Sequence, residues 1–371
     1  MRVGIPKESM AGESRVATVP DVVPKLVRAG LEVVVERGAG EACGHKDADY
    51  EAKGAQVADG QTALGCEIVL AVHPPAPDRL QPSTVLVCTP DPLGSPDTVA
   101  KLAERGLTCF AMELMPRISR AQSMDVLSSM ANVAGYKAVL LAAARSPKLF
   151  PLMMTAAGTV RPARVFILGA GVAGLQAIAT ARRLGAVVQA YDIRSDTKEQ
   201  VESLGARFVE FDLGLDDMQD AGGYAKELTD EQKTLQAKLM ADVIQNSDVI
   251  ITTAQVPGRK APLLIPAEVV EGMRPGSVIV DMAADSGGNC ALSEPGQEVE
   301  VHGVTIIGHS NLPSSVAQSS SLLYANNLAA FVTELLDEGA LKIDLDNEVI
   351  RGPLVCQAGE ITNDRIKEAL A

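Results

Sequence analysis

Three glycines near the middle of the chain have the spacing that dinucleotide binding requires. Gly169, Gly171 and Gly174 follow the apolar run RVFIL, 164–168, and open a segment with helical spacing. The first glycine allows a tight turn, the second lets a pyrophosphate approach the backbone at a helix N-terminus, and the third lets helix and strand pack closely. Asp192 ends the next predicted strand, where a carboxylate can accept hydrogen bonds from a ribose. The pattern predicts a dinucleotide site.

Asp192 also bears on which dinucleotide binds. A carboxylate at this position favours NAD, because it would repel the 2′-phosphate of NADP. Arg194 complicates the interpretation, since a nearby arginine can accept that phosphate. With the carboxylate at the strand tip, we predict NAD.

A second polar group lies in MELMPRISRAQSMDVLSSM, 112–130, just ahead of a long helical pattern. Arg117, Arg120, Gln122 and Asp125 fall close together there. A charged loop is usually a solvated loop. Because a proline precedes this one and an ordered helix follows it, we expect it to be held in place.

Two alternating series of strands and helices must position these residues. The first series predicts strands at 1–5, 31–38, 67–72, 84–89 and 107–113, and helices at 16–30, 47–55 and 95–106 with Ser95 as the N-cap. The second predicts strands at 164–168, 186–193, 207–211, 247–254, 277–283 and 304–308. Such alternation implies parallel sheets covered on both faces.

Long helical patterns at 123–146 and 314–339 flank the second series, and the first should be buried on several sides. We therefore predict an α/β protein with two Rossmann-like, doubly wound domains joined by two long helices, with the cofactor in the cleft between the domains. The N-terminal domain takes 1–135 and is completed by the tail, 316–371. The NAD-binding domain takes 136–315.

The composition excludes several classes of function. Lys and Arg number 33 against 47 Asp and Glu, a formal charge of −14, and Trp is absent. Nucleic acids and anionic membranes need a basic surface, so neither is an expected partner. The six cysteines have no CxxC spacing, so no metal site is predicted. We expect no signal peptide and no inserted membrane span, since the longest apolar runs are far shorter than roughly 20 residues.

The segment 212–240 starts strongly acidic and carries Gly222, Gly223 and Tyr224. Long inserts over a site are often lids. A disordered acidic insertion remains the alternative.

Several motifs together resemble the NAD(H)-binding component of proton-translocating nicotinamide nucleotide transhydrogenases, in the alanine dehydrogenase/transhydrogenase family. They include MRVGIPKE, ESRVATVP, GAGVAGLQAIATARRLGA, GGYAKE, DMAADSGGN and GHSNLPSSVA, and the block 112–139 is the most specific. The resemblance covers essentially the full length. It implies a homodimer that binds NAD(H) and exchanges hydride directly with NADP(H) held on a separate domain. It also implies a proton-channel subunit in the membrane and a cytoplasmic, peripheral location at the inner face of that membrane.

Matched motif by motif, the resemblance places the nicotinamide end of NAD at Arg117, Gln122, Asp125 and Ser128. It places the pyrophosphate turn at Val172, Ala173 and Gly174, the adenosine ribose site at Asp192, Ile193 and Arg194, a mobile loop at Gly223 and Tyr224, and less secure contacts at Gln236 and Gln255.

The donor and acceptor groups of the nicotinamide-side residues suggest roles. Gln122 can orient the nicotinamide or its ribose, and Asp125 can accept from a ribose hydroxyl, from the carboxamide or from Arg117. Arg117 can contact the pyrophosphate or pair with Asp125. Hydride exchange between two nicotinamides moves no proton at the reacting carbons, so a site without a general base suits it. We therefore treat these three residues as the catalytic set.

Two alternatives stay open. Alanine dehydrogenase shares the MRVGIPKE start, an arginine like Arg15 and an acid like Asp285, but has a catalytic lysine where this chain has His73, and its catalytic histidine has no counterpart here. An NAD-sensing module with the same fold would bind NAD and turn over little. The role of His73 and Asp285 is left undecided, with packing favoured for His73.

Overall fold

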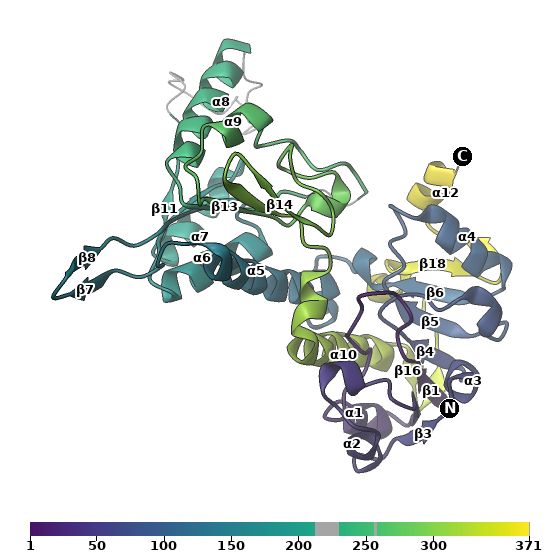
Figure 1. The fold of residues 1–371 in the computed structure, drawn as a ribbon. Coiled ribbons are helices and arrows are strands. Elements are labelled where there is room, and N and C mark those ends of the chain that lie inside the picture. The colour runs from purple at the N-terminus through teal and green to yellow at the C-terminus, as the bar shows by residue number, and fades with distance from the viewer. Residues whose placement is uncertain (212–229, 256–257, 371) are drawn as a thin grey trace. The chain divides into compact units, whose positions relative to one another are not determined.

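The computed structural model describes residues 1–211, 230–255 and 258–370. The chain divides into two compact units (Figure 1): the first comprises Met1–Val133 and Asn311–Ala371, and the second Ala134–Ser310. The boundaries expected from the sequence, 135/136 and 315/316, fall within a few residues of these. Each unit is built on one large sheet.

The first unit holds an eight-stranded sheet in the order β19-β18-β6-β5-β4-β1-β2-β3. Its strands are β1 (Arg2–Ile5), β2 (Glu32–Glu36), β3 (Gln56–Ala58), β4 (Ile68–Leu70), β5 (Val85–Cys88), β6 (Thr108–Ala111), β18 (Leu354–Gln357) and β19 (Glu360–Ile361). The strands from β3 to β6 run parallel, whereas β18 pairs antiparallel with β6. The C-terminal tail therefore completes this sheet, as expected, but reverses its direction.

Helices cover both faces of that sheet. They are α1 (Val23–Arg28), α2 (Asp47–Glu51), α3 (Gly60–Leu64), α4 (Pro96–Glu104), α10 (Ala317–Glu334), α11 (Glu348–Arg351) and α12 (Asp364–Leu370), with a small hairpin of β16 (Leu336–Asp337) and β17 (Ala340–Leu341). In β4, Ile68 and Leu70 pack in the core beside α10, while Val69 packs in the core beside α4. Alternate residues point to opposite faces, so a strand buried on both sides must be apolar throughout.

The second unit holds a seven-stranded sheet in the order β11-β10-β9-β12-β13-β15-β14. Its strands are β9 (Arg164–Leu168), β10 (Val187–Tyr191), β11 (Arg207–Phe208), β12 (Val249–Thr252), β13 (Val278–Asp281), β14 (Glu298–Val301) and β15 (Val304–Ile307). All run parallel except β14, which pairs antiparallel with β15. Helices α6 (Val172–Arg183) and α7 (Lys198–Ser203) lie on one face, and α8 (Asp230–Gln245) and α9 (Ala267–Glu271) on the other (Figure 1).

The two sheets share one topology. In each, the chain builds outward from a central strand in one direction and then returns to build in the other, so β1 and β4 are neighbours in the first unit and β9 and β12 in the second. Ligands of such sheets bind at the carboxyl ends of the strands at this point of reversal. The expected α/β class with two Rossmann-like sheets is confirmed, with antiparallel strands at the edges.

Helix α5 (Val126–Arg145) carries the chain from the first unit into the second. The second long helix, α10, lies wholly in the first unit, and the chain returns at Ser310–Asn311 instead. Within the chain α5 keeps Leu127 and Tyr136 exposed, so it is less buried than its composition suggests. Among the described residues α5 alone has the length and hydropathy of a membrane span, a test that core helices of soluble proteins also pass.

Several small elements were not expected. Short elements at β3, α3, α9 and β14 were missed, as was a hairpin of β7 (Met153–Thr155) and β8 (Gly158–Val160) that projects from the second unit (Figure 1). Ser95 occupies the N-cap position of α4, as expected, but its side chain makes no capping hydrogen bond, and Pro96 opens the helix. The 3₁₀ turns are η1 (Glu41–Cys43), η2 (Pro77–Arg79), η3 (Met112–Leu114), η4 (Ser119–Met124), η5 (Ser195–Thr197), η6 (Ala284–Ser286) and η7 (Leu312–Val316).

Candidate functional site

The glycine turn between β9 and α6 has the geometry that its sequence predicts. Gly169 has φ +99°, a backbone angle that residues with a side chain rarely adopt. A Cβ on Gly174 would lie 1.9 Å from the carbonyl oxygen of Gly169, so helix and strand pack in contact there. A Cβ on Gly171, by contrast, would meet no heavy atom within 4 Å. The turn is therefore closed behind Gly174 and open above Gly171, at the N-terminus of α6, where an anion is favoured.

Helix α5 supports this turn from within the second unit. A Cβ on Gly135 would lie 2.1 Å from the carbonyl oxygen of Ala173, so only glycine fits where α5 crosses the first turn of α6. Val172 at the same turn is 39% exposed. Sequence patterns carried no sign of the role of Gly135, because the contact joins residues far apart in the chain.

Asp192 follows β10 and binds four donors. Its Oδ2 accepts from the Ala170 backbone N–H at 2.7 Å and from Arg194 Nη2 at 3.0 Å. Its Oδ1 accepts from the Arg194 backbone N–H at 2.9 Å and from Arg194 Nε at 3.0 Å. Burial alone would raise the pKa of this carboxyl, but the hydrogen bonds from Arg194 and Ala170 lower it below its ordinary value. Asp192 is therefore a carboxylate that ties the glycine turn to β10.

The other side of the reversal point, after β12, is held by residues that sequence reasoning missed. Thr253 Oγ1 donates to the carbonyl oxygen of Gly169 at 3.1 Å. Asn289 binds both backbone groups of the next residue, Ala254: its Oδ1 accepts from the Ala254 N–H at 3.1 Å and its Nδ2 donates to the Ala254 oxygen at 2.9 Å. The same Nδ2 donates to the Pro262 oxygen at 2.8 Å.

Asp281, at the end of β13, fixes Asn289 in turn. This buried carboxylate accepts from the backbone N–H groups of Ala283, Asn289 and Cys290 and from the hydroxyls of Thr252 and Ser293, at 2.7–3.0 Å. A buried carboxylate is tolerated when its lone pairs are filled in this way. The motif DMAADSGGN pointed to this region, but the motif alone does not indicate which of its residues hold the loop.

Of the remaining predicted cofactor residues of this unit, the structure describes Gln236, Gln255 and Ile193. Gln236, on α8, donates to the Tyr191 hydroxyl at 2.6 Å, and Gln255 donates to the Met282 oxygen at 2.9 Å. Ile193 is 88% exposed. Gly223 and Tyr224 lie outside the described residues. Asp285 accepts from the Ser310 hydroxyl at 2.7 Å.

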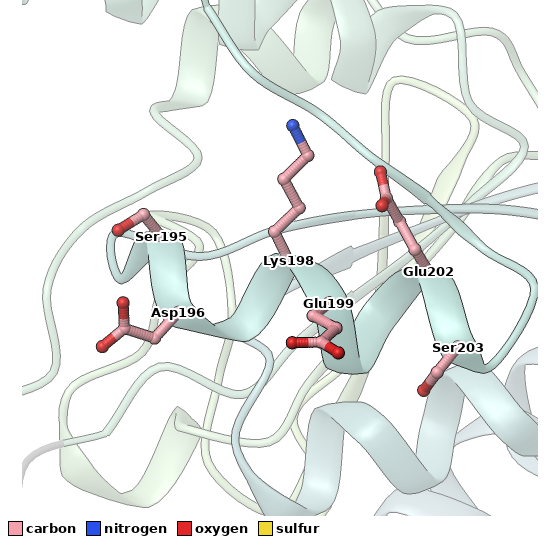
Figure 2. Close-up of a pocket in the computed structure, with 6 residues that line it drawn as sticks. All are labelled: Ser195, Asp196, Lys198, Glu199, Glu202 and Ser203. Carbon is pink, nitrogen blue, oxygen red and sulfur yellow. The ribbon is translucent and has the colours of Figure 1, made fainter.

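A shallow pocket beside this site does not belong to it. Figure 2 shows its lining residues on η5 and α7: Ser195, Asp196, Lys198, Glu199, Glu202 and Ser203. Lys198 and Glu202 point to one side of the helix and Asp196 and Glu199 to the other (Figure 2). The side chains do not converge, so the pocket offers no arrangement for chemistry.

In the first unit, the predicted nicotinamide-side loop is ordered, as expected. Ala121 and Met124 of η4 are buried in the core beside α10, and Asn327 of α10 donates to the Ser123 oxygen at 2.8 Å. Arg120 donates to Asn347. This support leaves the side chains of Arg117 and Gln122 exposed, and neither has a hydrogen bond or ion pair within the described ranges.

Asp125 is not free in the same way. Its Oδ1 accepts from the Ser128 N–H at 2.9 Å and its Oδ2 from the Ser128 hydroxyl at 2.6 Å. The carboxylate therefore caps the N-terminus of α5. Pairing of Asp125 with Arg117, one of the roles considered from the sequence, is not found in the structure.

His73 and Arg15 meet on one carboxylate in the first unit. The side chain of Glu13 is buried. Its carboxylate accepts from Arg15 Nη2 at 2.6 Å, lies 2.9 Å from His73 Nε2 and accepts from Asn311 Nδ2 at 2.9 Å. Beside it, burial raises the pKa of Glu8 to about 6, against backbone hydrogen bonds from Val72 and His73. His73 therefore belongs to a cluster of polar side chains that meet at the Glu13 carboxylate. No group of three or more His, Cys, Asp or Glu side chains suited to a metal ion occurs among the residues that the structure covers.

The open glycine turn, the carboxylate after the next strand and the reversal point between β9 and β12 define a dinucleotide-binding α/β protein of two units. The sequence matches two family profiles, "Alanine dehydrogenase/PNT, N-terminal domain" over residues 4–134 and "Alanine dehydrogenase/PNT, C-terminal domain" over residues 138–364. The chain belongs to the alanine dehydrogenase/PNT family.

Three relatives show where in the family it lies. It is 48% identical, over 98% of each chain, to a protein of Rhodospirillum rubrum that is named as the first portion of NAD(P) transhydrogenase subunit alpha. It is 30% identical to the alanine dehydrogenase of Bacillus subtilis, over 100% of this chain and 95% of that one. The solved structure of a transhydrogenase from Sinorhizobium meliloti superposes with a TM-score of 0.85 at 43% identity, covering 97% of this chain and 98% of that one. Of the two enzyme types, the transhydrogenases are closer in sequence.

Proposed function

We propose that this chain is the NAD(H)-binding component of a proton-translocating NAD(P) transhydrogenase. The observation that carries the proposal is the 48% identity, over 98% of both chains, to a protein named as a transhydrogenase subunit. The chemistry of the nicotinamide-side loop is in keeping with it. Arg117, Gln122, Asp125 and Ser128 supply guanidinium, amide, carboxylate and hydroxyl groups, and none of them is a histidine or lysine base.

The second unit fits the adenosine and pyrophosphate end of NAD. The open space above Gly171 and the N-terminus of α6 suit the pyrophosphate, with Val172, Ala173 and Gly174 around it. Asp192 suits the ribose, and the exposed Ile193 offers an apolar surface for the adenine. Gln236, Gln255, Gly223 and Tyr224 are proposed as further contacts.

The first unit is proposed to take the nicotinamide end. The exposed amide of Gln122 can orient the carboxamide or the ribose, and the exposed guanidinium of Arg117 can neutralise the pyrophosphate. Asp125 contributes mainly by fixing the start of α5, with its remaining lone pairs available to a ribose hydroxyl. NAD itself supplies the hydride acceptor or donor. The protein's own residues are left to position it and exclude water, a task that needs no proton donor.

The proposal includes partners. The second substrate, NADP(H), would be held on a separate NADP-binding domain, and a membrane subunit would carry the protons. The chain itself would be peripheral, at the cytoplasmic face of that membrane. We also propose a homodimer. Leu149, Leu152, Met153, Met154 and Val160 are exposed apolar side chains on and beside the β7–β8 hairpin, a concentration that suits burial against a second copy.

One set of mixtures separates the candidate functions. The chain is mixed with NADH and a purified NADP-binding transhydrogenase domain loaded with NADP⁺, and separately with NADH, pyruvate and ammonium. Oxidation of NADH in the first mixture alone is expected. Oxidation in the second would instead support alanine dehydrogenase, the enzyme type of the 30% identical relative. NADH binding without turnover in either mixture would favour an NAD sensor.

A matched variant tests the orienting residue in the same assay. Gln122→Asn keeps the amide but withdraws it by one methylene. Single-turnover hydride transfer is expected to slow by on the order of 100-fold while NADH affinity changes little, since misalignment costs rate more than binding. An unchanged transfer rate would remove Gln122 from the catalytic set without affecting the proposal for the chain.

A further inference from the structure

The carboxylate of Asp192 has no lone pair left for a ribose. A carboxylate offers about four acceptor positions. The backbone N–H groups of Ala170 and Arg194 take one on each oxygen, and the Arg194 guanidinium takes the other two through Nε and Nη2. The Asp192 side chain is only 7% exposed, so no other edge of it is open to solvent.

The four donors differ in how easily they can be displaced from the Asp192 carboxylate. The two backbone donors belong to the glycine turn and to the residue after the strand tip, and they are fixed by the fold. The guanidinium sits at the end of a flexible side chain that is 59% exposed. Only the arginine end of this ion pair is exposed, so the guanidinium can rotate into solvent without any movement of the backbone. The guanidinium is therefore the donor that can be replaced.

The positions that Arg194 holds match those a ribose needs. The guanidinium donates from Nε to Oδ1 and from Nη2 to Oδ2, both at 3.0 Å. Displacement of the guanidinium therefore frees one acceptor position on each carboxylate oxygen. A ribose presents two adjacent hydroxyls, the 2′ and the 3′, which can donate to two oxygens of one carboxylate.

We propose that the Arg194 guanidinium occupies the place of the adenosine ribose diol on Asp192 and is displaced when NAD(H) binds. This inference rests on the proposed NAD(H) function and reverses the role of one predicted contact. Arg194 competes with the cofactor at the ribose instead of recognising it. It keeps the buried carboxylate satisfied until a diol replaces it, and a ligand without an adjacent diol gains nothing by displacing it.

The test is NADH binding by calorimetry to four forms: the wild type, Arg194→Gln, Asp192→Asn and the double variant. Arg194→Gln is expected to tighten NADH binding about two- to fivefold, because the guanidinium no longer has to be displaced from Asp192. In the Asp192→Asn background the same change should have no tightening effect. The gain should also shrink as salt is raised, because the competing pair is screened.

Lys198→Gln is the matched control. It removes the same charge from the same unit, where Lys198 pairs with Glu210 at 2.5 Å on the surface. It should leave NADH affinity unchanged or slightly weaker, since the cofactor is an anion.

The two failures are distinguishable. If the wild type does not bind NADH, or Asp192→Asn does not weaken binding, the proposed cofactor site is wrong. If NADH binds in an Asp192-dependent manner but Arg194→Gln weakens binding or leaves it unchanged, Arg194 is not a competitor and the inference is wrong while the site stands.

Discussion

At the scale of single residues, the glycine turn shows how one motif carries two different physical demands. Gly174 is required by contact inside the fold, because a Cβ would overlap the Gly169 carbonyl at 1.9 Å. Gly171 has no such contact and an ordinary φ of −75°. The fold therefore does not require a glycine at position 171, and we expect the missing side chain to make room for the bound cofactor. Gly174 thus serves folding, whereas Gly171 serves binding.

We expect Gly171→Ala and Gly174→Ala to differ in their effect on stability. Gly174→Ala should destabilise the protein by about 1–3 kcal/mol through overpacking. Gly171→Ala should change stability by less than about 1 kcal/mol yet weaken NADH binding about tenfold or more, because its methyl group projects where the pyrophosphate is proposed. Urea unfolding and calorimetry measure the two effects. Equal destabilisation by both substitutions would contradict this interpretation of the turn.

Glu113, after β6, makes a second prediction at this scale, one of pH dependence. Burial raises its pKa to about 8, against a backbone hydrogen bond from Asp91 and with the charge of Asp91 adding to the rise. Its Oε2 is buried without a hydrogen-bond partner among the described residues. Between the ordinary pKa of 4.5 and about 8, the folded chain keeps a proton that the unfolded chain has released. Stability therefore falls as pH rises through this window.

Glu113→Gln removes the titration while keeping the acceptor that the Asp91 N–H uses at 2.7 Å. The variant should match the wild type in stability near about pH 5 and exceed it by roughly 1–3 kcal/mol near about pH 9, where the buried carboxyl ionises. Urea unfolding at several pH values gives the comparison. A stability difference that does not vary with pH would show that Glu113 titrates normally.

At the scale of elements, the loop after β12 depends on a side chain from a distant segment of the sequence. Asn289 holds both backbone groups of Ala254, and Asp281 holds Asn289. Hydrogen bonds to backbone groups that cannot reach water are costly to lose, at about 1–3 kcal/mol for each group left unsatisfied. These hydrogen bonds fix the loop after β12, across the reversal point from the glycine turn, although the loop itself is neither helix nor strand.

Asn289→Ala should therefore destabilise the protein by about 2–4 kcal/mol and weaken NADH binding on the order of tenfold, because the residue beside the glycine turn is released. Ser247→Ala serves as the control: it removes a buried hydroxyl that donates at 2.8 Å to the Val243 oxygen, away from the carboxyl ends of the strands. The control should lose about 1 kcal/mol of stability and keep its affinity. Parallel losses of affinity in both variants would mean that Asn289 has no particular effect on the site.

The elements that sequence patterns predicted well are those with strong periodicity and marked ends. The strands β4 and β5 are continuous apolar runs, and β9, β12 and β13 are apolar except at one end, at Arg164, Thr252 and Asp281. All of these strand residues are buried except Arg164. The missed elements have weak patterns. In β14 (EVEV) acidic residues alternate with valine at the sheet edge, and the β7–β8 hairpin exposes apolar residues that a core would normally hide.

At the scale of the whole molecule, the exposed apolar hairpin bears on assembly. Met153→Lys combined with Met154→Lys should convert the proposed homodimer to monomers of 38.8 kDa without loss of folding, since both side chains already face solvent within the chain. Light scattering coupled to size-exclusion chromatography reads the mass, and circular dichroism the fold. Met10→Lys, at another exposed methionine, should remain dimeric. A wild type that is monomeric at micromolar concentration would remove the dimer from the proposal.

The sequence by itself determined the α/β class, the glycine turn and the carboxylate after β10, because each depends on residues close together in the chain whose spacing repeats a local geometry. It also indicated an ordered polar loop before α5. Only the tertiary structure decided which groups those residues actually meet. Asp125 caps α5 instead of pairing with Arg117, and Asn289 hydrogen-bonds to the backbone of Ala254. Gly135 allows α5 to pack directly against the first turn of α6, and Arg194 donates to the carboxylate of Asp192. Most of these contacts join separate segments, and all of them depend on side-chain direction and packing, which spacing along the chain does not encode.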